Sequence, residues 1–398
     1  MPDFPRHLAA TLSVVAQGDP VLCLSGPRQS GKSTLARMAF PDRPYRTLKD
    51  ASTFALAQDP VTFFGQMPDG GVIDEVQRAP ALLAHLQTVV DAQRIMGRWI
   101  LTGSENLGLH HALSESLAGR VARMHLLPFS HAELAASDRR PRSLAQAVLL
   151  GGYPPLYDPE RQVEPWRWLS NYLETYVQND VLSLLRIQDR TAFWKFLMLC
   201  ARHVGCQTNA QQWGSEIGKD GKTIAGWLSV LESTFVLRLV PCSDQSFGKR
   251  MSKHPKLYFY DTGLACRLLG LNDPNQVVGH PRWGHLVENW CVIEVLKARW
   301  HRGLPDGMHH WRSSDGHEVD LVLTAGGHLN PIEIKASQTT DPSLIDGLRW
   351  WRDMASKKRV ANLGTGLLIH GGEQALDFGD VRLVPWYDID RALSGIGP

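Results

Sequence analysis

The sequence has 398 residues, too many for one ordinary domain and enough for two or three. Hydrophobic residues make up 43% and charged residues 21%, a composition typical of globular proteins. The formal charge of +2 gives the whole chain only a weak electrostatic field, so any nucleic-acid partner must be met by local basic patches.

The cysteines are scattered and form no CxxC pair, which argues against a disulfide framework or a zinc site and favours a reducing cytoplasm. The first residues, MPDFPRHLAATLSVVAQGDP, lack the apolar core and basic leader of a signal peptide. No apolar stretch approaches the ~20 residues needed to span a bilayer. We therefore expect a cytoplasmic protein without a membrane segment. The cysteines are Cys23, Cys200, Cys206, Cys242, Cys266 and Cys291.

The first part of the chain alternates short apolar runs with helical stretches. VLCLSG (21–26), GGVIDE (70–75) and RWILTGS (98–104) are typical of buried strands. A helix is expected after Lys32, and another over 80–94. Strands that alternate with helices predict an α/β fold with a parallel sheet covered on both faces.

GPRQSGKS matches the pattern G-x-x-x-x-G-K-[ST], and it lies between a predicted strand and a predicted helix, the context that a phosphate-binding loop requires. Lys32 is expected to reach the β- and γ-phosphates of ATP, and the Ser33 hydroxyl to bind Mg²⁺. The alternative is a chance glycine-rich turn. The nucleotide-binding residues predicted here are Gly26, Pro27, Arg28, Gln29, Ser30, Gly31, Lys32, Ser33 and Thr34.

Two further strand ends carry polar residues suited to ATP hydrolysis. Asp74 is expected to hold Mg²⁺ through water, and Glu75 to polarise the attacking water; a solvated strand exit is the alternative. Thr102 and Ser104 follow the next strand and could sense the γ-phosphate, or simply satisfy a turn.

SLAGRVARMHLLPFS offers two arginines, Arg120 and Arg123, as a finger that stabilises the transferring phosphoryl group of a neighbouring subunit. We predict that Arg120, which follows Ala-Gly, has this role. A plain surface or salt-bridging arginine is the alternative. A finger supplied in trans implies a homo-oligomer, and a ring of six is the expected form.

Residues 209–233 have the spacing of two helices around a glycine-containing turn, followed by a strand that could begin a wing. Such units bind DNA through the second helix, but they also serve as protein-interaction or packing modules. A basic run, GKRMSKHPK, is expected to be exposed and either contacts DNA or forms a solvated loop. The predicted DNA contacts are Lys219, Lys222, Thr223, Lys249, Arg250, Lys253 and Lys256.

Near the end of the chain, EVDLVL and NPIEIKA predict two paired strands that bring Asp320 close to Glu333 and Lys335. Glu288, on a helix predicted over 285–300, could add a third carboxylate. Acids plus a lysine are what a Mg²⁺-dependent phosphodiesterase needs, with Glu288, Asp320 and Glu333 as metal ligands. The alternatives are a cross-strand ion pair, or a DNA-binding platform of the same fold that does not cut.

These motifs resemble a bacterial and archaeal family of AAA-type (AAA+) P-loop ATPases whose C-terminal domain of unknown function is similar to the PD-(D/E)xK restriction-endonuclease fold. The resemblance covers nearly the whole length. It is carried by GPRQSGKSTL, IDEVQRAPALL, ILTGSENL and SLAGRVARMHLLPFSHAEL, by LLGGYPP, TYVQNDV, TIAGWLSVLESTFVLRLVP and SKHPKLYFYDTGLACRLLGL, and by GHLVENWCVIEVLKARW, EVDLVL and PIEIKAS.

The resemblance implies ATP and Mg²⁺ at Lys32, Ser33, Asp74 and Glu75. It also implies a nuclease-like site at Glu288, Asp320, Glu333 and Lys335.

We therefore divide the chain into an AAA+ ATPase domain (1–135), a helical lid or linker (136–205), a winged-helix-like domain (206–245) and a nuclease-like α/β domain (246–398). The expected function is ATP-driven remodelling of DNA or branch migration of a duplex or four-way (Holliday) junction. Two alternatives remain: an ATP-gated, Mg²⁺-dependent nuclease, and a nucleotide switch in defence or regulation without DNA motor activity.

Overall fold

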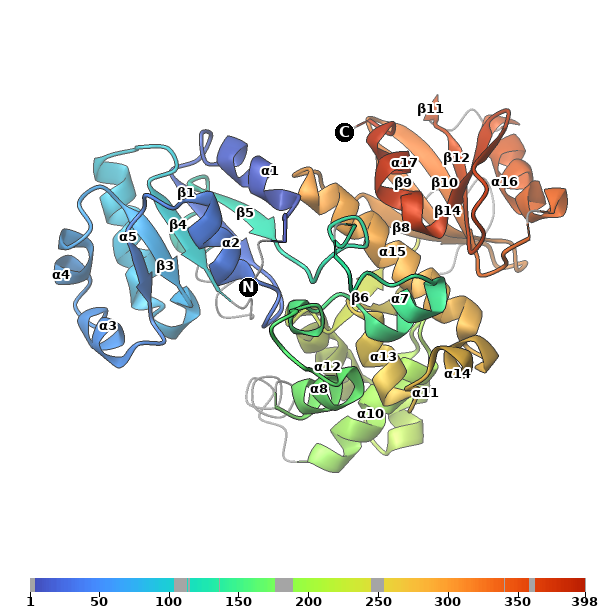
Figure 1. The fold of residues 1–398 in the computed structure, drawn as a ribbon, viewed down its shortest axis with the longest axis horizontal. Helices are drawn as coiled ribbons and strands as arrows, with labels where there is room; N and C mark the ends of the chain where they lie inside the picture. Colours follow the sequence, from blue (N-terminus) through green and yellow to red (C-terminus); the bar gives the residue numbers. More distant parts are fainter. Residues whose placement is uncertain are drawn as a thin grey trace.

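The protein is described by a computed structural model in which three regions follow one another along the chain, coloured from blue to red in Figure 1. Of the residues predicted to be functional, Ser104, Lys249, Arg250 and Lys253 lie outside the described part. The described residues are 4–103, 113, 115–135, 137–175, 189–244, 254–339, 341–357 and 362–397.

The N-terminal region is built on a five-stranded sheet in the order β2-β3-β4-β1-β5, with every neighbouring pair parallel. The strands are β1 (Val21–Ser25), β2 (Tyr45–Thr47), β3 (Gly71–Asp74), β4 (Trp99–Thr102) and β5 (Val121–His125). The surrounding helices are α1 (Leu8–Val15), α2 (Lys32–Ala39), α3 (Ala51–Leu56), α4 (Pro60–Gly65) and α5 (Ala81–Ala92).

Successive side chains of a strand point to opposite faces of the sheet, so each face packs against different helices. Leu22 and Ile100 pack with apolar residues of α1 and α2, whereas Cys23 and Leu101 pack with those of α4 and α5. The parallel sheet with both faces covered, predicted from the sequence, is thus confirmed.

The middle region is mainly helical. Asn209 and Asp220 cap the two helices of the predicted helix–turn–helix by accepting hydrogen bonds from backbone N–H groups of the first turn. A two-stranded antiparallel hairpin follows the second helix. The elements are α7 (Leu144–Leu150), α8 (Pro165–Tyr172), α10 (Arg190–Arg202), α11 (Ala210–Ile217), α12 (Gly221–Ser233), β6 (Leu237–Val240), β7 (Lys256–Phe259), α13 (Thr262–Leu268) and α14 (Pro274–Gly279).

The C-terminal region contains a mixed sheet in the order β13-β14-β12-β10-β9-β8, with β11 paired to β10. β9 pairs antiparallel with both β8 and β10, and the β9–β10 pair is the hairpin predicted from the sequence. β12 pairs parallel with both β10 and β14. The strands are β8 (Met308–Arg312), β9 (Glu318–Ala325), β10 (His328–Lys335), β11 (Asn362–Leu363), β12 (Gly366–His370), β13 (Leu376–Phe378) and β14 (Val381–Pro385).

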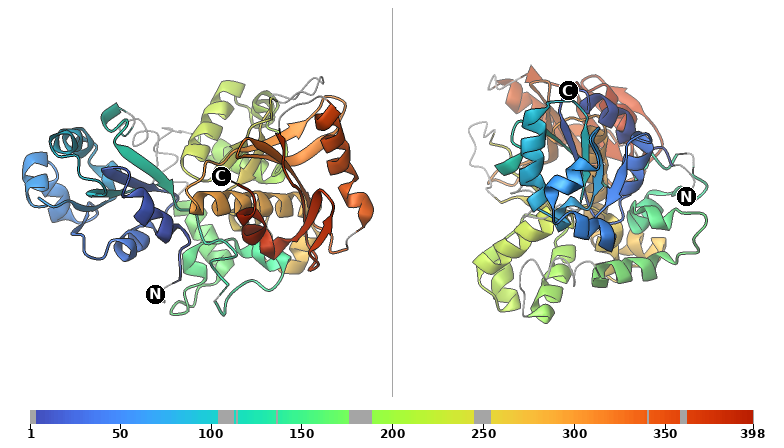
Figure 2. Two further views of the ribbon diagram at one scale, coloured as in Figure 1. Left: turned by 90° about the horizontal axis from the view of Figure 1, so that it is seen from above. Right: turned by 90° about the vertical axis from the view of Figure 1, so that its left-hand side faces the viewer.

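Two layers of helix cover this sheet. α16 (Asp346–Lys357) packs through Leu348 and Trp351 on one face, while α15 (Trp283–His301) and α17 (Ile389–Ser394) cover the other. α15 is buried along most of its length, and its last turn lies beside the N-terminal region, where the Trp300 ring packs on His125 of β5 (Figures 1 and 2). α15 therefore connects the two sheets.

The predicted domain boundary after residue 245 falls between the paired strands β6 and β7. One apolar core continues from the middle region into α15 and the C-terminal sheet. None of the described helices combines the length and apolar character needed to cross a lipid bilayer.

Candidate functional site

The loop from Gly26 to Lys32 joins β1 to α2 at the carboxyl end of the sheet. Gly26 and Gly31 have φ angles of +147° and +95°, which side-chain-bearing residues rarely adopt. A Cβ atom at Gly26 would lie 2.2 Å from the carbonyl oxygen of Leu126. Both glycines of the phosphate-binding motif are therefore required by the backbone, and the loop leads directly into the N-terminus of α2.

Lys32 is buried at the start of α2, and its Nζ donates hydrogen bonds to the carbonyl oxygens of Gly26 (2.9 Å) and Pro27 (2.7 Å). Burial lowers the pKa of this amino group to about 8. A bound polyphosphate would supply a counter-charge to this desolvated ammonium. Ser30 is also buried, and its hydroxyl finds no hydrogen-bond partner among the described residues. Both observations fit an anion held by this loop.

Asp74 lies at the end of β3, where two neighbouring strands and helix α2 bring hydroxyl groups to its carboxylate. It accepts hydrogen bonds from Ser33 Oγ (2.7 Å), Thr47 Oγ1 (3.0 Å) and Thr102 Oγ1. The strand register explains this, because Thr47 and Thr102 each pair directly with Asp74. Thr47 was not predicted, since no sequence motif marks it.

Burial by itself would raise the pKa of Asp74, but hydrogen bonds from Thr102, Ser33, Tyr45 and Thr47 outweigh this and hold it below its ordinary value. The carboxylate is thus ionised at neutral pH. An ionised carboxylate beside a serine hydroxyl is the oxygen donor set that Mg²⁺ prefers. The predicted Mg²⁺ ligands Ser33 and Asp74 are therefore chemically suited to that ion.

Glu75 follows directly and has a φ angle of +60°, a strained conformation for a residue with a side chain. Its Oε1 pairs with Lys49 Nζ at 2.8 Å, and its Oε2 accepts a hydrogen bond from Gln77. Neither partner was predicted. Both orient the carboxylate just beyond the strand end, where the water-polarising role was expected.

The remaining residues of the predicted nucleotide site lie around the loop. Arg28, Gln29 and Thr34 are exposed, and Gln29 has a φ angle of +61°. Pro27 is buried within the loop.

Arg120 lies far from this loop. It immediately precedes β5, whose register pairs Val121 with Val21, so Arg120 sits at the opposite end of β1 from Gly26, about 15 Å away along five residues. Its guanidinium forms two hydrogen bonds to Asp91 of α5, at 2.6 and 2.8 Å. Arg120 cannot serve the nucleotide of its own subunit, so its finger role stays a prediction that requires a neighbouring subunit.

The C-terminal residues predicted for the nuclease-like site also come together. Leu321 pairs with Ile332, so the next residues outward, Asp320 and Glu333, face each other across β9 and β10. Lys335 Nζ pairs with Glu333 Oε1 at 2.5 Å. Glu288 of α15 approaches the same cluster.

Lys256 occupies the centre of this cluster, which corrects the expectation that it lies on an exposed basic loop. It is only 2% exposed, on β7. Its Nζ lies 2.7 Å from Glu288 Oε1, 2.5 Å from Glu318 Oε1 and 3.6 Å from Asp320 Oδ1. Lys256 is therefore not available for the predicted DNA contact, and Glu318 is an acid of the cluster that the sequence analysis missed.

Burial and mutual repulsion shift two carboxyl groups of the cluster toward their protonated forms. Burial, and then repulsion from Asp320, raise the pKa of Glu333 to about 8, and burial is also the main cause that raises the pKa of Glu288 to about 7. No group of three or more His, Cys, Asp or Glu residues in the described part of the chain is placed to hold a metal ion. The carboxylates form an ion-pair cluster around Lys256, and the Glu288–Asp320–Glu333 metal set stays a prediction.

Replacing Lys256 with methionine is expected to destabilise the protein by roughly 3–5 kcal/mol at pH 8, because it leaves buried carboxylates without a counter-ion. Those carboxylates then have folded-state pKa values further above their unfolded values. A carboxyl group whose pKa is higher in the folded than in the unfolded chain stabilises the fold when it is protonated. This contribution is complete below the unfolded pKa, about 4.5, and is lost as the pH rises through the higher folded-state pKa. Urea unfolding at pH 5 and pH 8 should therefore show the larger loss at pH 8.

Lys195, which is exposed on α10, provides the matched control for this substitution. Lys195→Met should unfold at the same urea concentration as the unaltered chain at both pH values. A loss in Lys256→Met that is small or independent of pH would show that Lys256 does not neutralise the cluster.

The other predicted DNA contacts lie at the start of α12 and nearby. Lys219 pairs with Asp189 at 2.7 Å, and Thr223 Oγ1 donates to Asp220 at 3.1 Å. Lys222 is exposed. Of these three residues, only Lys222 makes no side-chain hydrogen bond or ion pair to an acidic residue among the described contacts.

The order of the N-terminal strands, the Gly26–Ser33 loop and the acid at the end of β3 define an ATPase of the AAA/P-loop type. In agreement, residues 18–135 match the family described as "AAA domain". The chain belongs to the same family as two uncharacterized mycobacterial proteins, Rv2008c of Mycobacterium tuberculosis and Mb2031c of Mycobacterium bovis. Each is 30% identical to it over 350 residues, which cover 86% of this chain and 76% of the relative.

Residues 141–275 and 283–389 match two families described as domains of unknown function, DUF8612 and DUF4143. Among solved structures, the Walker-type ATPase PABY2304 of Pyrococcus abyssi is similar, with 17% identity, coverage of 67% of this chain and 96% of that one, and a TM-score of 0.46. AMPPCP-bound DnaA of Aquifex aeolicus shows 16% identity, coverage of 56% and 85%, and a TM-score of 0.27.

Proposed function

We propose that this ATPase uses ATP hydrolysis to act on DNA that its C-terminal domain grips without cutting. The supporting observation is the single cluster formed by Asp320, Glu333, Lys335 and Glu288, next to Lys256. The cluster lies on α15 and on the neighbouring strands β9 and β10, an arrangement that supports the proposed nuclease-like domain. The Lys256 ammonium, which is paired with Glu288 and Glu318 inside the cluster, counts against a metal-dependent cutting role.

The nucleotide site assigns a role to each of its residues. Lys32 binds the β- and γ-phosphates, Ser33 and Asp74 hold Mg²⁺, and Glu75 orients the attacking water. Bound Mg²⁺ would neutralise charge on the phosphate oxygens. Thr102 donates a hydrogen bond to Asp74, and in this proposal it senses the γ-phosphate.

The proposal includes a homo-oligomer, because Arg120 lies at the end of the sheet away from its own phosphate loop. In a ring, that end of one subunit can face the nucleotide of the next, and the Asp91–Arg120 pair would have to open for the guanidinium to act there. A hexamer is the form that we propose.

The test is the ATP turnover of the 398-residue chain with duplex, single-stranded and four-way-junction DNA, with native mass measured on the same sample. We expect one of these DNAs, the junction or the duplex, to raise turnover several-fold while the DNA stays intact in Mg²⁺. Turnover that no DNA changes would favour the nucleotide-switch alternative. Cleavage that disappears in Asp320→Ala would favour the ATP-gated nuclease.

Two lysine-to-alanine variants test in the same assay whether α12 contacts DNA. Lys222→Ala removes an exposed charge at the start of α12, whereas Lys195→Ala removes one from α10. If α12 contacts DNA, only Lys222→Ala should weaken the stimulation and reduce its dependence on salt, with the DNA-free rate unchanged.

A further inference from the structure

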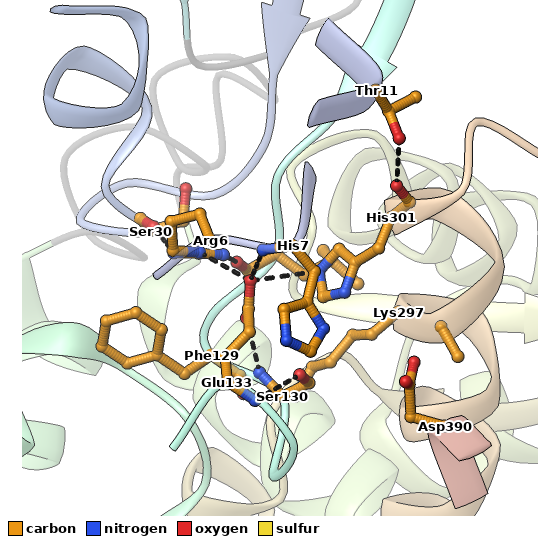
Figure 3. Close-up of polar contacts among 12 residues, drawn as sticks. Arg6, His7, Thr11, Ser30, Phe129, Ser130, Glu133, Lys297, His301 and Asp390 are labelled. Carbon is orange, nitrogen blue, oxygen red and sulfur yellow. Dashed lines mark hydrogen bonds and ion pairs between the residues drawn. The ribbon is translucent and has the colours of Figure 1, made fainter. Parts of the chain in front are cut away.

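We propose that Arg6 is a positioning residue for the phosphate loop, and that it orients the peptide bond between Ser30 and Gly31 from outside the loop. Arg6 precedes α1 and is only 8% exposed. Its guanidinium donates from Nη1 to the Ser30 carbonyl (2.8 Å) and from Nε to Glu133 Oε1 (3.0 Å) (Figure 3). Its Nη2 donates to the Leu127 carbonyl (2.7 Å). No motif marks this residue in the sequence.

The bond to Ser30 has a consequence for the neighbouring N–H group. A trans peptide is planar, and its C=O and N–H point in opposite directions. With the Ser30 carbonyl turned toward Arg6, the N–H of Gly31 points to the other side of the loop. Backbone N–H groups turned inward are what a phosphate-binding loop offers to its ligand. Gly31, with its φ of +95°, is the residue of this peptide that can rotate most freely.

Arg6 is itself held in place by the segment that follows β5. Glu133 is completely buried; besides Arg6, it accepts hydrogen bonds from the backbone N–H groups of His7 and Ser130, each at 2.9 Å. Burial alone would raise the pKa of Glu133, but Arg6 and His301 outweigh this and lower it to about 2. The carboxylate therefore stays charged at physiological pH, and the Arg6 guanidinium packs over the Phe129 ring at 4.7 Å.

The same segment is fastened to the end of α15. Lys297 Nζ donates to the Phe129 carbonyl (2.9 Å), and Glu294 Oε2 accepts from the His131 N–H (2.9 Å). His301 Nε2 lies 3.7 Å from Glu133 Oε1 (Figure 3). Arg6 thus orients the phosphate loop relative to a segment anchored on the helix that carries Glu288.

The inference rests on nucleotide binding at the phosphate loop, so the affinity of the unaltered 398-residue chain for a fluorescent MgADP analogue is measured first. Arg6→Lys keeps a positive charge beside Glu133, but the compact lysine ammonium cannot donate to all three partners as the planar guanidinium does. We expect roughly tenfold weaker binding of the analogue and a similar rise in the KM for ATP. The kcat at saturating ATP should change less, because bound phosphate then orders the loop. Arg6→Ala should show the same split more strongly.

Arg302→Ala is the matched control, because Arg302 lies just after α15 and pairs with Asp390 rather than with the phosphate loop. Its nucleotide affinity and KM should be unaltered. An Arg6→Lys chain that has normal affinity and KM, or that loses only kcat together with thermal stability, would overturn the inference. An unaltered chain that binds no nucleotide would instead overturn the function of the loop.

Discussion

Lys32→Ala should lose measurable nucleotide binding and at least about 100-fold of the ATP turnover, the cost typical of removing one preorganised group that stabilises charge in the transition state. The ammonium is buried and bonded to the loop carbonyls of Gly26 and Pro27, whereas Arg28, another cation of the loop, is exposed to solvent. Binding is measured by titration with a fluorescent ATP analogue, and turnover by phosphate release.

Lys195→Ala removes an exposed lysine of α10 and controls for the loss of one positive charge. It should bind and hydrolyse ATP as the unaltered chain does. Unchanged affinity and turnover in Lys32→Ala would mean that the loop is not the nucleotide site, and the proposed use of ATP would then fail with it.

Glu75→Gln is expected to separate binding from hydrolysis. Glutamine keeps the size of the side chain but cannot take a proton from water, so turnover should fall by roughly 10²–10⁴. Affinity for ATP should stay within a few-fold, because Lys32, Ser33 and Asp74 are untouched. Rapid filtration followed by chromatography of the bound nucleotide should then recover ATP from the variant and ADP from the unaltered chain.

The matched control is Glu216→Gln, an exposed position on α11. If Glu75→Gln turns over ATP at a normal rate, another group orients the water, and the assignment of Glu75 is wrong while that of Lys32 stands.

The loop and strand end of the candidate nucleotide site can be predicted from the sequence because their parts are local. A strand, a glycine-rich turn and a helix follow one another within a few residues, and Asp74 ends an apolar run. Thr47 and Lys49 were missed because β2 has only three residues and too little apolar alternation to be recognised. Their place beside Asp74 and Glu75 comes from the order of strands in the sheet.

The prediction for Lys256 failed for a related reason. Its neighbours in the sequence are basic and polar, which favours an exposed loop. In the structure its partners are Glu288 on α15 and Glu318 on β9, both distant along the chain, and their combined charge outweighs the cost of burying the ammonium. Tertiary charge pairing of this kind leaves no local pattern.

The segment after β5 also limits what the first 135 residues can do by themselves. Leu127, Phe129 and Leu134 belong to the apolar core of the middle and C-terminal regions, not to the two cores that flank the nucleotide-binding sheet. A fragment cut after residue 135 would expose these side chains to water and would sever Arg6 and Glu133 from their anchor on α15. We therefore expect that the first 135 residues do not fold stably alone, because the rest of the chain covers the apolar side chains of the segment that follows β5.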